Sequence, residues 1–346
     1  MLRNREMVAT KLQRIAEKAR IESSCRFTSL FHLMNVDMLR ECFRQLRKDA
    51  AAGIDKVTKK EYGLSLEKNL AALVEKLHRM SYIPLPVRRV YIPKPGSSKE
   101  RPLGIPALED KLVQAGLARI LSAIYEQDFI DDSYGFRPGR GCHDALRALS
   151  QEVEGGRIHY IVDADIKGFF DNVDHEWLMK FLGHRIADKR VLRYVKRFLK
   201  AGIMENGAVS ASDKGTPQGG IVSPILANIY LHYSLDLWFT RVFQKGCYGQ
   251  SRMIRYADDF VVCFERESDA IRFRQALDER LSIFGLEISP EKTKTIEFGP
   301  FAEAKAKRRG GKAATFDFLG FTHYCSRSRN GRRFRMKRVT SRKKFT

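Results

Sequence analysis

Apolar side chains recur every three or four positions in several segments of the chain, which is the spacing of an amphipathic helix. Residues 64–80 show this spacing most clearly, and the apolar face there is expected to be core. That face carries Leu66, Leu70, Leu73, Val74 and Leu77. Similar spacing or helix-start residues predict further helices at residues 4–19, 36–47, 107–129 and 268–284, from about Asp144, after Asn172 or Asp174, and from Ser223.

Short apolar runs bounded by turn residues predict strands between these helices. Residues 252–264 hold two such runs with Asp258 and Asp259 between them, which is typical of a hairpin with an acidic tip. Neither G-x-G-x-x-G nor a Walker motif occurs, which disfavours a Rossmann or P-loop nucleotide site. Other strand-like segments lie at residues 158–165, 295–298 and 316–321, and a second hairpin is predicted at residues 88–105.

The charge of the chain indicates that its partner is a nucleic acid. The 346 residues, enough for about two domains, include 63 Lys and Arg against 41 Asp and Glu, a formal net charge of +22. Such an excess indicates a polyanionic partner. It is concentrated in residues 301–346, and residues 327–344 hold no acid. We expect that stretch to be extended, or ordered only on phosphate or a further domain; a solvated basic tail is the alternative.

Cysteine spacing and hydropathy indicate in which cellular compartment the protein resides. The six cysteines show no C-x-x-C spacing and no histidine cluster beside them, so neither a zinc site nor a disulfide framework is indicated. No run approaches the roughly 18 apolar residues of a membrane span. We therefore expect a soluble protein of the bacterial cytoplasm that has no membrane partner.

The acidic tip at Asp258 and Asp259 needs a neighbouring cation, because adjacent carboxylates repel each other and raise each other's pKa. Mg²⁺ prefers oxygen ligands and commonly takes one or two carboxylates plus substrate phosphates. Asp165, at the end of a predicted strand, is the candidate third carboxylate. Asp163 falls on the same strand face by period two. The bland alternative is a solvated turn, since Asp is common in turns.

Two motifs together resemble the metal-binding motifs of reverse transcriptases. They are Tyr256-Ala-Asp-Asp259 and Ala164-Asp-Ile-Lys-Gly-Phe-Phe-Asp171. The chain more narrowly resembles bacterial group II intron-encoded reverse transcriptases, also called maturases, through further stretches in the family's order. These are Ile92-Pro-Lys-Pro-Gly96, Arg101-Pro-Leu-Gly-Ile-Pro106, Gly135-Phe-Arg-Pro-Gly-Arg-Gly141, Gly215-Thr-Pro-Gln-Gly-Gly220, Ser289-Pro-Glu-Lys-Thr-Lys294 and Phe318-Leu-Gly-Phe321.

The resemblance implies an α+β right-hand polymerase with helical fingers and an antiparallel-sheet palm. The expected divisions are a basic helical arm at 1–30, fingers at 31–157, and a palm at 158–325 in which part of 176–215 could belong to the fingers. Residues 326–346 are expected to be a basic linker toward a missing thumb.

The resemblance also implies the catalytic metal site. It makes Asp165, Asp258 and Asp259 metal ligands, with the carbonyl of Ile166 as a further one. The expected cofactor is two Mg²⁺ ions, with Mn²⁺ as a substitute. Such a pair clamps the attacking and leaving oxygens of an in-line phosphoryl displacement. Lys292 is expected to protonate the leaving pyrophosphate, although an ordinary surface lysine is the alternative.

Substrate contacts follow from the same motifs. Phe170 matches the steric gate that excludes a 2′-hydroxyl, whereas Phe169 is better explained as a core aromatic. Lys94 and Arg101 match residues that grip the incoming triphosphate, and Lys99 could replace Lys94. Gln218, beside Gly219, matches the loop that supports the nascent base pair. For nucleic-acid contacts we expect template phosphate at Arg137 and Arg140, and a primer grip, or alternatively core, at Phe318 and Gly320.

The implied function is an RNA-directed DNA polymerase of a group II intron that also binds the intron RNA to assist splicing and retrohoming. Its expected partners are an intron RNA template, a DNA primer or target, and dNTPs, and a homodimer stays open. Two alternatives remain at this point. One is an RNA-binding splicing maturase with dispensable polymerase activity, and the other is a reverse transcriptase associated with phage defence or CRISPR.

Overall fold

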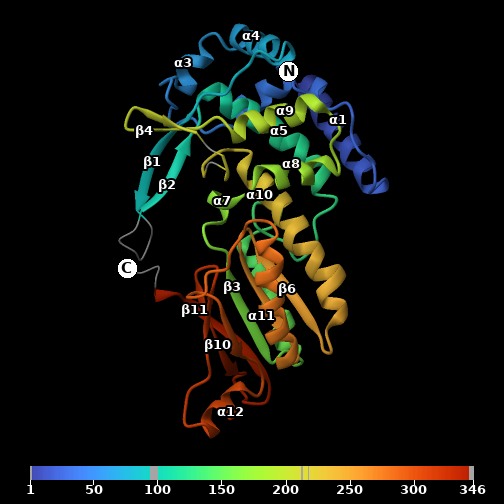
Figure 1. The fold of residues 1–346 in the computed structure, drawn as a ribbon, viewed down its shortest axis with the longest axis vertical. Coiled ribbons are helices and arrows are strands. Elements are labelled where there is room, and N and C mark those ends of the chain that lie inside the picture. The colour runs from blue at the N-terminus through green and yellow to red at the C-terminus, as the bar shows by residue number, and fades with distance from the viewer. Residues whose placement is uncertain (1, 94–99, 212, 217, 343–346) are drawn as a thin grey trace. The chain divides into compact units, whose positions relative to one another are not determined.

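The chain forms two compact units in the computed structural model, which describes residues 2–93, 100–211, 213–216 and 218–342, with side chains from Glu6 onward (Figure 1). Unit 1 holds the described residues up to Ile92, Glu100–Phe129 and Phe170–Tyr230. Unit 2 holds Ile130–Phe169 and the described residues from Leu231 on. The expected fingers differ from unit 1, because residues 130–157 belong to unit 2. Residues 176–215, which were expected to belong in part to the fingers, lie in unit 1 with the rest of 170–230.

Unit 1 is mainly helical, and α5 lies at its centre. Most of the α5 side chains are buried, and α1 and α2 pack against that helix. Polar caps fix several helix starts: Asn35 accepts from the Met38 amide at the start of α2, and Asp174, one of two expected caps, accepts from the Trp177 amide at the start of α8. The helices are α1 (Leu2–Ile21), α2 (Val36–Gln45), α3 (Lys59–Gly63), α4 (Leu66–His78), α5 (Leu108–Tyr125), α8 (His175–Gly183), α9 (Lys189–Leu199), most of α7 (Phe169–Asn172) and α10 (Ser223–Leu231), and the short 3₁₀ helix η1 (Phe31–Leu33).

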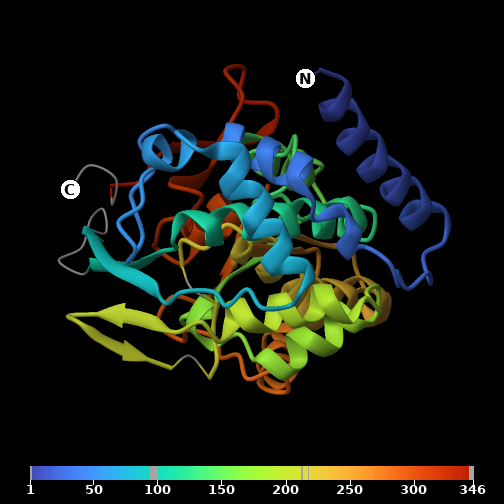
Figure 2. The same ribbon diagram turned by 90° about the horizontal axis from the view of Figure 1, so that it is seen from above.

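The sheet of unit 1 has the order β2-β1-β4-β5. It consists of β1 (Val87–Pro93), β2 (Glu100–Ile105), β4 (Ile203–Glu205) and β5 (Ala208–Ser210). Figure 2 shows the β4–β5 hairpin in yellow. Its turn is Asn206-Gly207, both with positive φ, and Asn-Gly is the preferred sequence for such a two-residue turn. The sequence analysis missed this hairpin because its strands are only three residues long.

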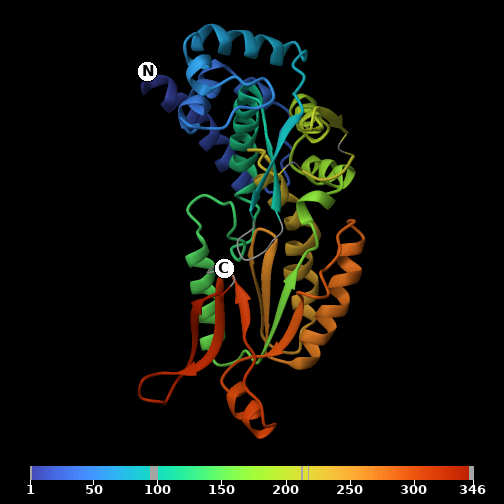
Figure 3. The same ribbon diagram turned by 90° about the vertical axis from the view of Figure 1, so that its left-hand side faces the viewer.

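Unit 2 is built on an antiparallel sheet of order β6-β7-β3-β8. Its strands are β3 (Tyr160–Asp165), β6 (Ser251–Tyr256), β7 (Asp259–Phe264) and β8 (Lys294–Glu297). Helices cover both sides of these strands (Figure 3), with α6 (Cys142–Glu154) on one side and α11 (Glu267–Ser282) on the other. The expected hairpin at 252–264 and the expected strand at 158–165 are both confirmed.

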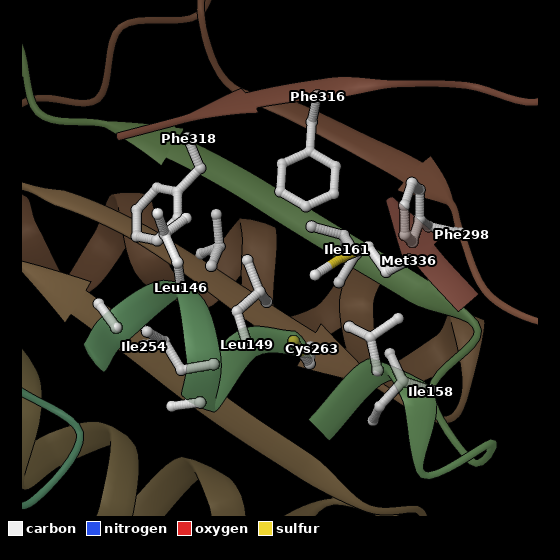
Figure 4. Close-up of a cluster of buried hydrophobic side chains, with 14 of the residues drawn as sticks. Leu146, Leu149, Ile158, Ile161, Ile254, Cys263, Phe298, Phe316, Phe318 and Met336 are labelled. Carbon is white, nitrogen blue, oxygen red and sulfur yellow. The ribbon is translucent and has the colours of Figure 1, made fainter. Parts of the chain in front are cut away.

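The core between α6 and this sheet also takes in a second, smaller sheet. Leu146 and Leu149 of α6 pack with Ile161 and Cys263 of the main sheet (Figure 4). Phe316 and its neighbours in the second sheet complete this cluster. The second sheet has the strand order β11-β10-β9 and consists of β9 (Phe316–Phe318), β10 (Phe321–Arg327) and β11 (Phe334–Thr340). The face with Ile161 is therefore buried toward α6 at one end of the strands.

The basic C-terminal segment is the main correction to the sequence analysis. Residues 326–346 were expected to be a linker, yet β11 pairs with β10 along its whole length, from Phe321 opposite Thr340 to Arg327 opposite Phe334. Met336 is the reason, because it is buried in the unit 2 core. Three apolar side chains, Phe334, Met336 and Val339, among many cations were too weak a pattern to predict the strand.

The remaining helical segments of unit 2 lie at His232–Asp236 and Phe239–Phe243, both π-helical, and at Gln244–Gly246 and α12 (Ala302–Arg308). Within the part of the chain that the structure describes, no helix is both long enough and apolar enough to span a membrane.

Candidate active site

The acidic pair lies at the tip of the β6–β7 hairpin. Tyr256 and Asp259 are the last paired residues, so Ala257 and Asp258 form a two-residue turn. Ala257 has a φ of 57°, in the left-handed region that few non-glycine residues adopt. Strain of this kind concentrates at functional sites, where surrounding contacts hold it in place.

Asp165 lies directly across from this turn. In the antiparallel pairing of β3 with β7, Asp165 is opposite Asp259 and Asp163 is opposite Val261. Paired Cα atoms in such strands are only about 5 Å apart. Residues two apart share a strand face, so Asp163, Asp165 and Asp259 all lie on the face that carries Ile161. The strand that ends at Asp165 thus lies beside the acidic hairpin, as the candidate set of three carboxylates requires.

A cavity of about 390 Å³ opens over these carboxylates. Its polar lining brings together five acids and two lysines, from strands β3, β7, β8 and β9 and from the segment before β8. In that segment Lys292 donates from Nζ to Oδ2 of Asp165 at 2.8 Å. The lining residues are Asp163, Ala164, Asp165, Asp259, Phe260, Glu291, Lys292, Lys294, Thr315, Asp317, Phe318 and Leu319.

Asp163 carries the clearest electrostatic consequence of this crowding. Burial and, after it, the negative charges of Asp259, Asp317 and Asp165 together raise the pKa of Asp163 to about 7, while Lys294 opposes them. The pocket therefore concentrates negative potential that a cation would neutralise. The sequence analysis placed Asp163 on the correct face but did not include Asp317, which reaches the pocket only through the pairing of β9 with β10.

The donor set fits a divalent cation in its chemistry. Asp165 and Asp259 face the same cavity, and the ammonium of Lys292 already occupies a cation position on Asp165. Among the described residues, no three acidic, histidine or cysteine side chains converge on one point. Asp165 and Asp259, with Asp258 in the adjoining turn, could therefore supply only part of the ligands of a metal ion, and substrate phosphates or waters would have to supply the rest.

Arg255, which was not among the residues predicted from the sequence, holds the acidic turn in place. Arg255 is fully buried and pairs through Nε and Nη2 with both oxygens of Asp236, which is also fully buried. The Arg255 guanidinium also donates to the Ala257 carbonyl at 2.8 Å and to the Ser133 hydroxyl at 2.8 Å. One side chain thus links a π-helical segment, the 130–135 loop and the strained turn.

Gly135 completes this support by its lack of a side chain. A Cβ placed on Gly135 would lie 2.2 Å from the Ala257 nitrogen, closer than any real contact. The backbone approach is possible only for glycine. At Gly135 the glycine-rich arm at 134–141 therefore packs directly against the acidic turn.

Phe170 and Gln218 meet in a different cavity, of about 270 Å³, within unit 1. Arg89 and Lys214 also line it. Phe169, in contrast, is buried, which agrees with its interpretation as a core aromatic. Gly219 has a φ of 107°, and a Cβ there would lie 2.5 Å from the Gly104 carbonyl oxygen. The Gly104 amide donates to the Gln218 carbonyl, which joins this loop to β2.

The other expected contact residues have different outcomes. Lys94 and its alternative Lys99 lie outside the described residues, whereas Arg101 is exposed on β2. Ile166 is buried and bridges to Ile288. Phe318 is buried and lines the acidic cavity. Gly320, with a φ of 79°, forms the turn between β9 and β10, so the expected strand at 316–321 is a hairpin.

The two arginines of the arm separate clearly. Arg137 is buried, and its Nη1 donates to the carbonyls of Ile130 and Ser133 at 2.7 Å each. This corrects the expectation of a phosphate contact, because the side chain is used to hold its own loop. Arg140 pairs with exposed Asp131 and lies over the Tyr134 ring, where it stays a candidate for phosphate contact.

The pairing of the two acidic motifs on one antiparallel sheet defines a polymerase-type palm, and comparison with known proteins agrees. The family model described as reverse transcriptase (RNA-dependent DNA polymerase) matches residues 92–323, more than half of the chain. The chain therefore belongs to the reverse transcriptase family.

The relatives narrow this assignment. The chain is 40% identical over 222 residues to the group II intron-encoded protein LtrA of Lactococcus lactis subsp. cremoris, across 64% of this chain but only 37% of that protein. It is 35% identical over 289 residues to protein YkfC of Escherichia coli strain K12, across 74% of this chain and 76% of that protein. The resemblance to group II intron reverse transcriptases is thus confirmed.

A solved structure supports the fold alone. Telomerase from Candida albicans, determined with a fragment of telomeric RNA, superposes with a TM-score of 0.53 at 14% identity. The superposition covers 77% of this chain and 48% of that one. A mixed α/β polymerase fold is therefore shared despite little sequence identity.

Proposed function

We propose that this chain is an RNA-directed DNA polymerase that adds dNTPs to a DNA primer on an RNA template, within a group II intron. The single observation that carries the proposal is the register of β3 with β7, which sets Asp165 opposite Asp259 beside a strained acidic turn. Membership of the reverse transcriptase family supports it. Similarity to LtrA, a group II intron-encoded protein, supports the intron context. The proposal includes binding of intron RNA to assist splicing.

The proposed metal ligands are Asp165, Asp258 and Asp259, with the carbonyl of Ile166, and the proposed ions are two Mg²⁺. Bound divalent ions would supply Lewis-acid activation of the phosphoryl group and stabilise the leaving oxygen. The chain itself contributes a turn of defined geometry and the proton on Lys292. The Lys292 ammonium lies 2.8 Å from Asp165, which places an acidic proton beside the proposed ligands.

The proposed test is single-nucleotide extension of a primed RNA template by Asp165→Asn. Loss of one ligand charge should lower the extension rate by roughly a hundredfold or more, as removal of other preorganised electrostatic groups does. Asp278→Asn, on an exposed part of α11, removes one carboxylate from the same unit and serves as the control. Equal rates for the two variants, with both folded, would rule out Asp165 as a ligand.

A further inference from the structure

Helix α9 belongs to unit 1 and is labelled in Figure 1. Its exposed face carries a row of cations along its whole length. The inner face is apolar and buried through Val191, Tyr194, Val195, Phe198 and Leu199. The exposed residues on the other side follow the helical spacings of four, three and four. They are Lys189, Arg193, Lys196 and Lys200 at the C-cap, and we call them the α9 basic stripe.

The α9 basic stripe has no acidic partner among the described residues. The salt bridges of the structure include none of its four members, although they include their neighbour Arg190, which approaches Asp188 at 3.9 Å. Asp188 is itself buried, and its oxygens accept backbone amides of Leu30, Phe31, Arg190 and Val191. The carboxylate of Asp188, which directly precedes the helix, is therefore committed to capping rather than to neutralising the stripe.

Such a row is unfavourable for the helix by itself. Like charges three or four residues apart destabilise a helix by about 0.2 to 0.5 kcal/mol per pair. Lys189 adds a further cost, because a cation in the first helical turn opposes the helix dipole. By contrast, α4 in the same unit mixes its exposed charges, with Lys68 and Lys76 beside Glu67 and Glu75.

The helix is held in spite of this cost by contacts from its other sides. The Tyr194 hydroxyl donates to the Leu77 carbonyl, and Arg197 donates to the carbonyls of Met80 and Tyr82. The Tyr194 ring stacks on Phe31 at 5.3 Å. The tertiary structure thus presents a rigid row of unneutralised cations, which an anionic polymer would stabilise.

We propose that the α9 basic stripe of unit 1 binds the phosphate backbone of folded RNA. Eleven residues of rise make the stripe about 16 Å long, enough to meet several phosphates along one strand. The stripe has no aromatic side chain on which an unpaired base could stack, which favours backbone over base contacts. None of its residues lines either cavity described above.

A membrane surface fits the same charges less well. Helices that lie on membranes insert exposed Trp, Phe or Leu side chains between the lipids. The apolar side chains of α9 are packed inside unit 1. The charge on α9 can therefore attract an anionic surface, but the helix offers nothing to insert. This inference deepens the proposed function by giving it an RNA-binding surface, yet it does not depend on catalysis.

The test is a fourfold variant, Lys189→Gln, Arg193→Gln, Lys196→Gln and Lys200→Gln, in the full chain. Binding of a fluorescent hairpin RNA should weaken by about tenfold or more at moderate salt. The slope of log K against log salt should become less steep by about 3, because each phosphate contact releases about 0.7 to 0.9 counterion when it forms and four such contacts are lost. The matched control removes an equal number of positive charges from exposed positions elsewhere in unit 1. Its substitutions are Lys56→Gln, Lys60→Gln, Lys68→Gln and Lys76→Gln.

Further readouts separate this inference from the proposed polymerase. With a short primed template at saturating concentration, the fourfold variant should extend primers at the parental rate. If the Asp165→Asn test showed that Asp165 is not a metal ligand, the RNA affinity measured for the fourfold variant would still test the stripe. Its melting temperature should be unchanged or higher, since like-charge repulsion is relieved. Unchanged RNA affinity and salt slope, equal losses in the control, or a loss confined to binding of phosphatidylserine vesicles would each overturn the inference.

Discussion

At the residue scale, identical side chains a position or two apart have different surroundings. Asp163 and Asp165 share a strand face, but burial keeps the pKa of Asp163 near 7, whereas Asp165 is paired with the Lys292 ammonium. Phe169 is core and Phe170 lines a cavity. A short polar motif identifies which residues are candidates, and their neighbours decide what each one does.

Replacing Phe170 tests the proposed steric gate. Phe170→Val removes most of the ring from the unit 1 cavity, so a ribose 2′-hydroxyl should be accommodated and the ratio of rNTP to dNTP incorporation should rise about tenfold or more. The measurement is competitive single-nucleotide extension. Phe169→Leu is the control, and it should reduce stability without changing that ratio, because Phe169 is buried. An unchanged ratio in Phe170→Val would remove the gate.

Acid sensitivity should come partly from His323, which is fully buried and stacked on Phe316 at 4.9 Å. Burial lowers the pKa of His323 to about 4, from an ordinary value of 6.5. The neutral form is favoured by folding, so this contribution to stability is complete above about pH 6.5 and is lost as the pH falls toward 4. At pH 5 the loss is about 2 kcal/mol, at about 1.4 kcal/mol per pKa unit.

The variant His323→Phe should therefore show a weaker fall in the free energy of unfolding between pH 7 and pH 5 than the parent. Urea titrations at several pH values measure this slope, whatever the change in absolute stability. His184→Phe, at an exposed position in unit 1, is the control and should keep the parental slope. A parental slope in His323→Phe would mean that another group causes the acid sensitivity.

At the element scale, the β6–β7 hairpin depends on contacts that no pattern within it reveals. Alternating apolar runs and the acidic tip predicted its strands and its turn correctly. The support by Asp236 and Ser133 could not be predicted, because both are remote in sequence and sit in a helix and a loop of ordinary composition. For the same reason β11 was missed, since its pairing with β10 and the burial of Met336 exist only in the folded unit.

Arg255→Lys tests whether this support positions the turn. A lysine cannot bond both Asp236 oxygens, Ser133 and the Ala257 carbonyl at once, so the turn should shift. We expect kcat to fall roughly 10- to 100-fold and the Mg²⁺ concentration for half-maximal activity to rise, since small displacements of reacting groups are costly. Both quantities are measured under conditions in which the variant is folded.

The control for that variant lies on the same strand. Arg252 pairs with Asp132 and Glu152, and those pairs are partly exposed and do not reach the turn. Arg252→Lys should therefore lose some stability but keep the parental dependence on Mg²⁺. If both variants change the Mg²⁺ dependence equally, Arg255 acts only through general stability.

At the scale of the whole molecule, the net charge of +22 indicates nucleic acid, but charge alone says nothing of where it binds. The structure separates three kinds of cation. Some are buried in loops, as Arg137 is; some are paired, as Arg252 is; and some are exposed without acids, as in the α9 basic stripe. The third kind is available to bind phosphate. The amino-acid composition does not distinguish it from the other two kinds, because it counts every Lys and Arg alike.

The sequence by itself determined the acidic hairpin, the strand that ends at Asp165 and most of the helices, because local periodicity and turn residues encode them. It also determined the family, because several short motifs in a fixed order are specific as a set. Only the tertiary structure decided that Asp165 lies opposite Asp259 and that Arg137 is buried. It also decided that cations near the C-terminus belong to strand β11, which pairs with β10. Each of these depends on residues distant in the chain, whose pairing and burial are set by packing rather than by local sequence.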